Sequence, residues 1–255
     1  MIFETHAHYD DEKFNEDRHE LIKSFPENGI EYVVNIGSSV ESCRATTELA
    51  KQYDFVYAAL GVHPSEVQYI TDDFFQWLEE EVKANPKVKA VGEIGLDYYW
   101  QEPEADLQKI WFERQIELAR RLHKPMVIHS RDAAKDTYDM MSERKCGEIG
   151  GVIHCFSYSA EEARKYLDMG FYIGIGGVVT FKNAKKLCEV TKYVPMDRIL
   201  LETDCPYLAP EPNRGKRNSS LNLTYIAEKI AEIKNVSYEE VVEKTNENAR
   251  RMYGI

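Results

Sequence analysis

Residues 2–8, Ile2-Phe3-Glu4-Thr5-His6-Ala7-His8, predict a buried strand that opens the domain and carries two histidines. Side chains alternate between the two faces of a strand, so His6 and His8 point the same way. Two imidazoles on one face make half of a metal site. The motif is short, and an unremarkable pair of histidines at a polar strand end explains this stretch equally well. The rest of the chain has to decide between the two interpretations.

Length and composition narrow the class of protein. The chain has 255 residues, of which 43% are hydrophobic, enough for a sizeable core. About 250 residues is also the usual size of a single (β/α)8 barrel. The formal net charge of -12 argues against a protein that coats DNA or a membrane surface, because such binding rests on broad basic patches. Any contact with nucleic acid must therefore be local.

The cysteines and the apolar runs bear on location. The five cysteines are an odd number without CxxC spacing, which suits reduced thiols better than a disulfide framework. No secretory signal precedes the first expected strand, and no apolar run approaches the roughly 20 residues that a membrane helix needs. We therefore expect a soluble cytoplasmic protein that makes no membrane contact.

Short apolar runs alternate with helical stretches along the chain. Helices are expected over residues 17–25, 43–53, 73–84 and 104–122, and a further one has Ser159 and Glu162 in a capping-box relation and Gly170 as its stop. The expected strands are residues 2–8, 32–37, 56–63, 88–93, 126–129, 151–154, 171–175 and 198–204.

The expected strands lack polar alternation, which is typical of a parallel sheet covered by helices. Eight such units fit a TIM-type (β/α)8 barrel, an α/β fold, formed by one domain over residues 1–255. A doubly wound open sheet is the alternative. The one long irregular stretch, residues 206–220, is rich in Pro, Gly and basic residues and is a candidate functional loop.

Metal-binding side chains recur where the expected strands end. In a barrel these carboxyl ends surround one pocket, so residues far apart in the chain converge. Four imidazoles and two carboxylates suffice for two divalent ions, with one carboxylate bridging and positions left for water. The five histidines lie at the ends of four expected strands, so unrelated core histidines would require the same coincidence four times. The residues at the strand ends are His6, His8, His63, Glu93, His129, His154 and Asp204.

Two other features are given no catalytic role. Cys155 and Cys205 directly follow His154 and Asp204, so strand alternation would turn them toward the helices and make a thiol ligand or nucleophile improbable. The glycines of residues 174–177 lack the spacing of a nucleotide-binding loop. They are better explained by backbone that passes close to the pocket.

Seven runs of sequence together resemble the TatD family of metal-dependent DNases, in order and over nearly the whole chain. They are Glu4-Thr5-His6-Ala7-His8, Gly61-Val62-His63-Pro64, Val91-Gly92-Glu93-Ile94-Gly95-Leu96-Asp97-Tyr98, Ile128-His129-Ser130-Arg131-Asp132-Ala133, His154-Cys155-Phe156-Ser157, Glu202-Thr203-Asp204-Cys205-Pro206-Tyr207 and Arg214-Gly215-Lys216-Arg217-Asn218.

The resemblance implies an amidohydrolase-like barrel with a dinuclear site that hydrolyses phosphodiester bonds in DNA as an exonuclease. It also implies that Glu93 bridges the two ions, and that the metal ligands are His6, His8, Glu93, His129, His154 and Asp204. The chain departs from the family pattern at two places. Glu4 stands where Asp is more usual, and Ser219-Ser220 stand where the basic loop usually continues with Glu-Pro. The second departure makes substrate preference less secure than the metal site.

The expected chemistry is activation of water by divalent ions. Asp204 is the candidate general base, and Glu93 is the second expected catalytic residue. His63 either contacts a phosphate oxygen or supports a ligand. Cations near the same end are expected to bind substrate, since barrels often bind phosphate on the loops after strands seven and eight. These cations are Arg131, Arg214, Lys216 and Arg217; for the last three, a solvated surface is the alternative.

Metal identity and substrate leave several alternatives open. Mixed nitrogen and oxygen ligands suit Zn, Mn, Ni or Fe, whereas oxygen-rich sites suit Mg. The expected substrate is DNA, either single-stranded or at 3′ ends, and the expected state is a monomer. One rival is a dinuclear hydrolase of amide, lactone or aminoacyl ester bonds, which likeness of fold cannot exclude. Another is a metal-binding or scaffold protein without catalysis.

Overall fold

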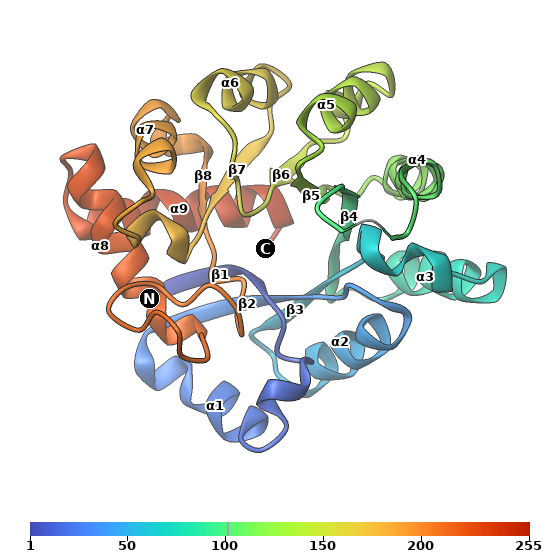
Figure 1. Cartoon of the computed structure of the whole chain (residues 1–255). Coiled ribbons are helices and arrows are strands. Elements are labelled where there is room, and N and C mark those ends of the chain that lie inside the picture. Colours follow the sequence, from blue (N-terminus) through green and yellow to red (C-terminus); the bar gives the residue numbers. More distant parts are fainter. Residues whose placement is uncertain (101) are drawn as a thin grey trace.

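Eight parallel strands follow one another around a single sheet in chain order in the computed structural model, which describes residues 1–100 and 102–255. A parallel bridge between Ala7 and Cys205 joins the first strand to the segment just after the last strand, so the sheet closes into a barrel (Figure 1). The strands are β1 Ile2–Ala7, β2 Ile30–Ile36, β3 Val56–Leu60, β4 Val88–Asp97, β5 Met126–Arg131, β6 Gly151–Ile153, β7 Tyr172–Ile175 and β8 Ile199–Leu201. The predicted (β/α)8 barrel is confirmed, and the open-sheet alternative is wrong.

Helices surround the barrel (Figure 1). They are α1 Arg18–Ser24, α2 Val40–Gln52, α3 Asp72–Ala84, α4 Ala105–Leu122, α5 Ala134–Glu143, α6 Ala160–Asp168, α7 Lys185–Tyr193, α8 Leu223–Lys234 and α9 Tyr238–Tyr253. The predicted start and stop of α6 are confirmed. The Ser159 hydroxyl accepts a hydrogen bond from the Glu162 backbone at 3.3 Å, and Gly170 follows the helix with a φ of 86°.

Three strand ends differ from the sequence prediction by three residues or more. β3 stops at Leu60, because His63 instead caps the short 3-10 helix Pro64–Tyr69. β8 stops at Leu201, and Asp204 adopts a left-handed φ of 57°. β4 continues past Glu93 to Asp97, because it stays paired with β5. Catalytic candidates therefore lie on loops as well as on strands.

The amino-terminal end of the barrel is filled by side chains. Its interior cluster contains Phe3, Val34, Ile36, Ala59, Ala90, Val127, Val152, Tyr172 and Leu200, with at least one residue from each strand. Ala249, Met252 and Tyr253 of α9 complete this cluster. The Tyr253 hydroxyl donates to the Thr5 carbonyl at 2.9 Å, which fastens α9 to β1. Helix α9 therefore closes one end of the barrel and leaves the other for the site.

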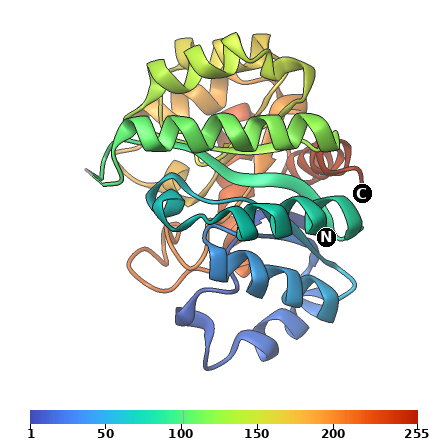
Figure 2. The ribbon, with the colours of Figure 1, turned by 90° about the vertical axis from the view of Figure 1, so that its right-hand side faces the viewer.

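Figure 2 shows both termini at one end of the molecule and the loop after β8, in orange, at the other. Among the described residues, no helix combines the length and the apolar character that crossing a membrane would take. The five cysteines are free.

Candidate metal centre

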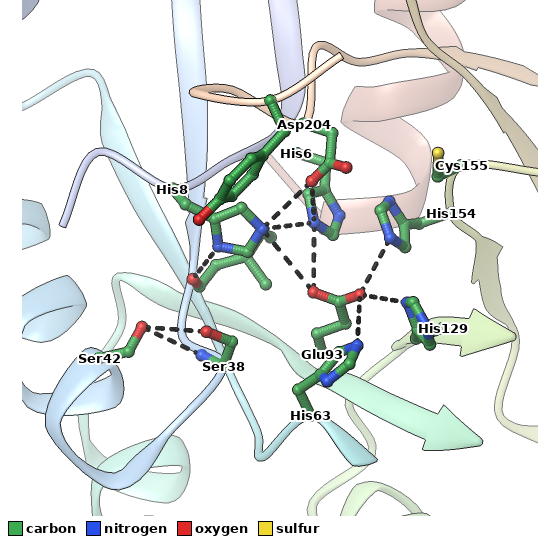
Figure 3. Close-up of polar contacts among 12 residues, drawn as sticks. His6, His8, Ser38, Ser42, His63, Glu93, His129, His154, Cys155 and Asp204 are labelled. Atoms are coloured by element: carbon green, nitrogen blue, oxygen red, sulfur yellow. Dashed lines mark hydrogen bonds and ion pairs between the residues drawn. The ribbon is translucent and has the colours of Figure 1, made fainter. Parts of the chain in front are cut away.

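The strand ends place six of the predicted side chains around one point (Figure 3). β1 and the residue after it supply His6 and His8, while β4 and β5 supply Glu93 and His129. His154 follows β6 directly, and Asp204 follows β8 after two residues. Close packing of β4 against β5 depends on Gly95, where a Cβ would lie 1.9 Å from the His129 carbonyl oxygen. The sequence folds so that side chains from across the barrel converge, as predicted.

Glu93 lies at the centre of this group and divides it in two. Its Oε1 lies 2.9 Å from His129 Nδ1 and 2.9 Å from His154 Nε2. Its Oε2 lies 3.5 Å from His6 Nε2 and 3.8 Å from His8 Nε2. Each oxygen of one buried carboxylate therefore faces its own set of imidazoles, and Figure 3 shows His63 as a third, more distant imidazole at Oε1.

Asp204 belongs to the pair that faces Oε2. Its Oδ1 lies 3.3 Å from His8 Nε2 and 3.7 Å from His6 Nε2. The Asp204 backbone N–H donates to the His6 carbonyl at 2.9 Å, which fixes the turn that carries the carboxylate. The group around Oε2 thus has two imidazoles and a second carboxylate, whereas the group around Oε1 has two imidazoles.

The hydrogen bonds of two imidazoles show which nitrogen is available to a cation. His8 Nδ1 donates to the Ile36 carbonyl at 2.9 Å, so Nε2, which faces Asp204 when no cation is bound, is the nitrogen that can give up its proton to a cation. His129 Nε2 donates to Asp97 Oδ2 at 2.9 Å, so Nδ1, which donates to Glu93 when no cation is bound, is the nitrogen that can do the same. Both available nitrogens point toward the centre.

The donor set fits divalent cations. His6 Nε2 and His8 Nε2 are 3.2 Å apart, so two facing lone pairs would repel unless a proton or a cation lies between them. Sets of three ligands fall on both sides of Glu93, one made by His6, His8 and Glu93 and the other by Glu93, His129 and His154. Imidazole and carboxylate together suit Zn, Mn, Fe or Ni.

The protein keeps the central carboxylates ionised. Burial raises the pKa of Glu93, but the charge on His154 and the hydrogen bonds from His129 and His154 outweigh burial and hold this pKa well below its usual value. Burial likewise opposes ionisation of Asp204, and the hydrogen bond with His8 more than offsets it, so the pKa of Asp204 is lowered. Ionised carboxylates are the form that binds metal.

His63 lies at the edge of the centre rather than within either group. Its Nε2 is 3.9 Å from Glu93 Oε1, and its ring meets the His129 ring edge-on with centroids 4.2 Å apart. Burial and the charge on His129 lower the pKa of His63 to about 3, so the imidazole is neutral. Phosphate contact and support of a ligand both remain open for it.

Two buried acids were given no role by the sequence analysis. Asp97 orients His129 as described above, and it ends β4 four residues beyond Glu93. Glu202 accepts a hydrogen bond from the Cys155 backbone N–H at 2.5 Å and lies 3.6 Å from His154 Nδ1. Both acids lie in sequence runs that also carry predicted metal ligands. An acidic residue at the end of an apolar strand was the sequence signal that could have identified them.

Gly174 makes room for Glu202, because a Cβ there would come within 2.4 Å of the Glu202 carboxylate. The backbone at the predicted glycine run therefore passes close to a buried acid beside His154, while residues 174–177 are not among those that line the pocket over the centre. The alternation argument for Cys155 is wrong, since β6 ends at Ile153 and Cys155 lies in a turn with a φ of 45°. Burial raises the pKa of its thiol well above the usual value.

A pocket of about 730 Å³ opens over the centre. Its wall includes His8, His63, Glu93, His129, His154 and Asp204, together with Asp10, Asp11, Ser38, Ser39, Ser42, Ser65, Glu66, Asp97, Trp100, Arg131, Tyr207 and Leu208. Arg131 is the single Lys or Arg side chain that the described part of the chain contributes to this wall. The wall is strongly acidic, so an anion enters only if cations offset that charge.

The three cations of the loop after β8 do not line the pocket. Arg217 forms an ion pair with Asp17 at 2.5 Å, and the Arg214 guanidinium carbon lies 4.2 Å from the Phe181 ring centroid. Lys216 is exposed. Substrate contact by these three residues stays a prediction. At the end of the loop, the Ser220 hydroxyl is hydrogen-bonded to the Tyr9 hydroxyl at 2.7 Å, so this departure from the family pattern joins the loop to the chain after β1.

Comparison with known proteins gives consistent matches over the full length. The family model described as TatD related DNase matches residues 3–254. A Bacillus subtilis (strain 168) protein with the printed name "Uncharacterized metal-dependent hydrolase YabD" is 44% identical, with all of both chains covered. The crystal structure of YjjV, a TatD homologue from Escherichia coli K12, superposes with a TM-score of 0.94 at 27% identity, covering 100% of this chain and 98% of that one.

A more distant structure shares the fold alone. A mutant of a PTE-like lactonase from Deinococcus radiodurans has a TM-score of 0.66 at 13% identity, with 99% of this chain and 95% of that chain covered. At this identity the likeness carries no information about the substrate.

Proposed function

Because the chain belongs to the TatD related DNase family, we propose that it is a metal-dependent hydrolase that cleaves phosphodiester bonds in DNA. The observation that carries the proposal is the placement of Glu93, whose two oxygens face separate pairs of imidazoles. This arrangement supports two cation positions that share one carboxylate. His6, His8, Asp204 and Glu93 would hold one cation, and Glu93, His129 and His154 would hold the other.

Two divalent cations bound there would lower the pKa of a coordinated water to about 7 and offset charge on the phosphate. The protein supplies the base and the orientation. The Asp204 side chain is 17% exposed and that of Glu93 is 4% exposed, so water in the pocket reaches Asp204 first. Since its low pKa keeps Asp204 ionised at neutral pH, it can accept the proton of the attacking water. Glu93 holds the two halves of the centre at a fixed spacing.

The pocket favours attack at a chain end. It is closed below by the side chains that fill the barrel, and its walls rise from loops on several sides. A blind pocket admits the end of a single strand more readily than the middle of a duplex. We therefore propose exonuclease action on single-stranded DNA or on 3′ ends, by a monomer. The identity of the metal, among Mg, Mn, Zn, Ni and Fe, and a cytoplasmic location stay predictions.

Two rival functions predict different substrates and different turnover. A hydrolase of amides, lactones or aminoacyl esters would use the same centre on a carbonyl group. A scaffold protein without catalysis would bind metal and turn nothing over. The complete ligand set with an adjacent ionised base supports an enzyme.

The test is metal analysis of protein purified without chelator, run beside hydrolysis assays on a labelled single-stranded oligonucleotide and on lactone and aminoacyl ester substrates. We expect release of mononucleotides by the parent and almost none by a folded Asp204→Asn variant. Asp168→Asn, which changes an exposed aspartate at the end of α6, is the matched control. Turnover of esters without cleavage of DNA would favour the first rival, and no turnover with bound metal would favour the second.

A further inference from the structure

Two large aromatic side chains lie uncovered at the mouth of the pocket. Trp100, just after β4, is 55% exposed, and Tyr207, in the loop after β8, is 46% exposed. Both belong to the wall of the pocket over the metal centre. Aromatic surface left in water at the edge of a functional pocket indicates a binding surface for a flat or apolar group.

A cation accompanies the aromatic surface on each side. The Arg131 guanidinium carbon lies 3.7 Å from the Tyr99 ring centroid, and the Tyr99 ring meets the Trp100 ring edge-on with centroids 4.9 Å apart. Across the mouth, Lys13 Nζ lies 4.1 Å from the Tyr207 ring centroid. We name these two groups the Trp100 rim (Tyr99, Trp100 and Arg131) and the Tyr207 rim (Lys13 and Tyr207).

The two rims lie on opposite sides of the barrel. The Trp100 rim follows β4 and β5, and the Tyr207 rim follows β8 and β1. In an eight-stranded barrel with strands in chain order, β4 and β8 are four strands apart and face each other. The metal centre lies between them, because its ligands come from the same four strands and from β6.

We propose that the two rims stack unpaired nucleobases of a single strand, one on each side of the phosphodiester that is cleaved. The inference rests on the proposed nuclease function and specifies its substrate as single-stranded nucleic acid bound with little sequence preference. Every base has a π-face that stacks on an aromatic ring, and a neighbouring Lys or Arg side chain attracts the phosphate beside that base. Bases in a duplex are already stacked on their neighbours and do not reach the rims.

The surroundings of the rims favour this occupant over others. The pocket wall carries the acidic side chains of Asp10, Asp11 and Glu66, and the Tyr207 hydroxyl donates to Asp11 at 2.7 Å. Without bound metal, the cations of the two rims are therefore the positive charges near the mouth that can attract a phosphate. A small carbonyl substrate held at the metal centre would have no group that spans two aromatic surfaces on opposite sides. Alternating aromatic and cationic groups match the alternating bases and phosphates of a strand.

The first experiment compares a single-stranded oligonucleotide with a dinucleotide of two tetrahydrofuran abasic sites, a small phosphodiester that has neither a base nor another aromatic ring. For each variant, the quantity measured is kcat/KM for the oligonucleotide divided by kcat/KM for the small diester. We expect this ratio to fall about tenfold in Trp100→Ala and again in Tyr207→Ala, with most of it kept in Trp100→Phe. Tyr193→Ala, which removes a 48% exposed tyrosine at the end of α7, should leave the ratio at the parent value.

The second experiment removes bases from the substrate. Oligonucleotides with one abasic position, moved along the strand, are cleaved by the parent and by each variant. If Trp100 stacks a particular base, the loss of that base should make the parent and Trp100→Ala equal, because the same interaction is then missing in both. A different abasic position should do so for Tyr207→Ala. The two positions should lie on either side of the scissile bond.

The outcomes separate the inference from the function beneath it. A parent protein that hydrolyses the small diester and leaves DNA uncut overturns the nuclease function and the inference with it. A parent protein that cuts DNA while both alanine variants keep the parent ratio overturns the inference alone and leaves the nuclease intact. A third outcome also overturns the inference. If duplex and single-stranded DNA are cut equally well, and no abasic position removes the effect of Trp100→Ala, the exposed rings bind another partner.

Discussion

Replacing Asp97 by Asn should weaken one of the two proposed metal positions and spare the other. Asp97 Oδ2 accepts a hydrogen bond from His129 Nε2 at 2.9 Å, and its Oδ1 accepts one from the Tyr99 backbone at 2.9 Å. An asparagine of the same shape has only one acceptor oxygen. If that oxygen keeps the Tyr99 bond, the amide N–H₂ faces His129 Nε2 and requires a lone pair there. The imidazole proton then moves to Nδ1, the nitrogen beside Glu93.

The magnitude follows from the loss of this orienting bond. Replacement of a carboxylate that orients a metal-bound histidine typically weakens metal affinity by about 10- to 100-fold, which is about 1.4–2.7 kcal/mol. The loss should fall on the position made by Glu93, His129 and His154. The position made by His6, His8 and Asp204 has no hydrogen bond to Asp97 among the described residues and should keep its affinity.

The assay is competition for metal against a chromophoric chelator, with two binding constants fitted and the total metal checked by elemental analysis. Asp136→Asn is the matched control, since Asp136 also accepts a hydrogen bond, from the Tyr98 hydroxyl, but does not contact the centre. Equal affinities in parent and Asp97→Asn would refute the tautomer argument. An equal loss at both positions would refute the division of the centre into two halves.

The remaining predictions address the other half of the centre, the loop and the buried seam between β1 and β8. His6→Ala combined with His8→Ala should reduce bound metal from two ions per chain to one, and an unchanged count would remove these histidines from the site. Lys216→Ala should raise KM for DNA with kcat nearly kept, and should lower the slope of log affinity against log salt by about one, because one counterion fewer is released; an unchanged slope would make Lys216 solvated surface. Burial raises the pKa of Glu4 from 4.5 to about 7 against the hydrogen bond from Thr203, so the folded state holds a proton that the unfolded chain has released. In chelator-treated protein, the free energy of unfolding of the parent relative to that of Glu4→Gln at the same pH should therefore fall by about 3 kcal/mol between about pH 4.5 and pH 7, as measured by urea unfolding. The histidines titrate in both proteins and cancel in this difference, so parallel pH curves would contradict the assignment to Glu4.

The sequence was most informative where a residue's position depends on periodicity. His6 and His129 lie on strands whose ends the hydrophobic pattern located closely, so their convergence followed from the barrel alone. It was less informative where the chain leaves the strand. His63 and Asp204 were placed on strands that stop three residues short of each of them, and the turn beyond each strand is set by local hydrogen bonds.

The partners of charged side chains could not be predicted from sequence. Arg214, Lys216 and Arg217 are close in the chain, but each long, flexible side chain extends in its own direction. One stacks on Phe181, one is exposed and one pairs with Asp17 across the barrel seam. The sequence analysis gave Asp97 and Glu202 no role for the same reason. The hydrogen bond between His129 and Asp97 depends on side-chain rotamers, which sequence periodicity does not specify.

The acidic pocket couples substrate binding to metal binding. Six carboxylates and one arginine line the wall, so the empty protein would repel a phosphodiester. Two divalent cations would add four positive charges against the two carboxylates that ligate them, which reverses the sign of the charge at the centre alone. The walls outside the centre stay acidic, apart from the cations of the two rims. A strand would therefore be attracted at three places, the metal centre and each rim, and repelled between them. If the proposed function is right, that spacing of charge would hold one phosphodiester over Glu93 and Asp204 while the aromatic rings take the bases on either side.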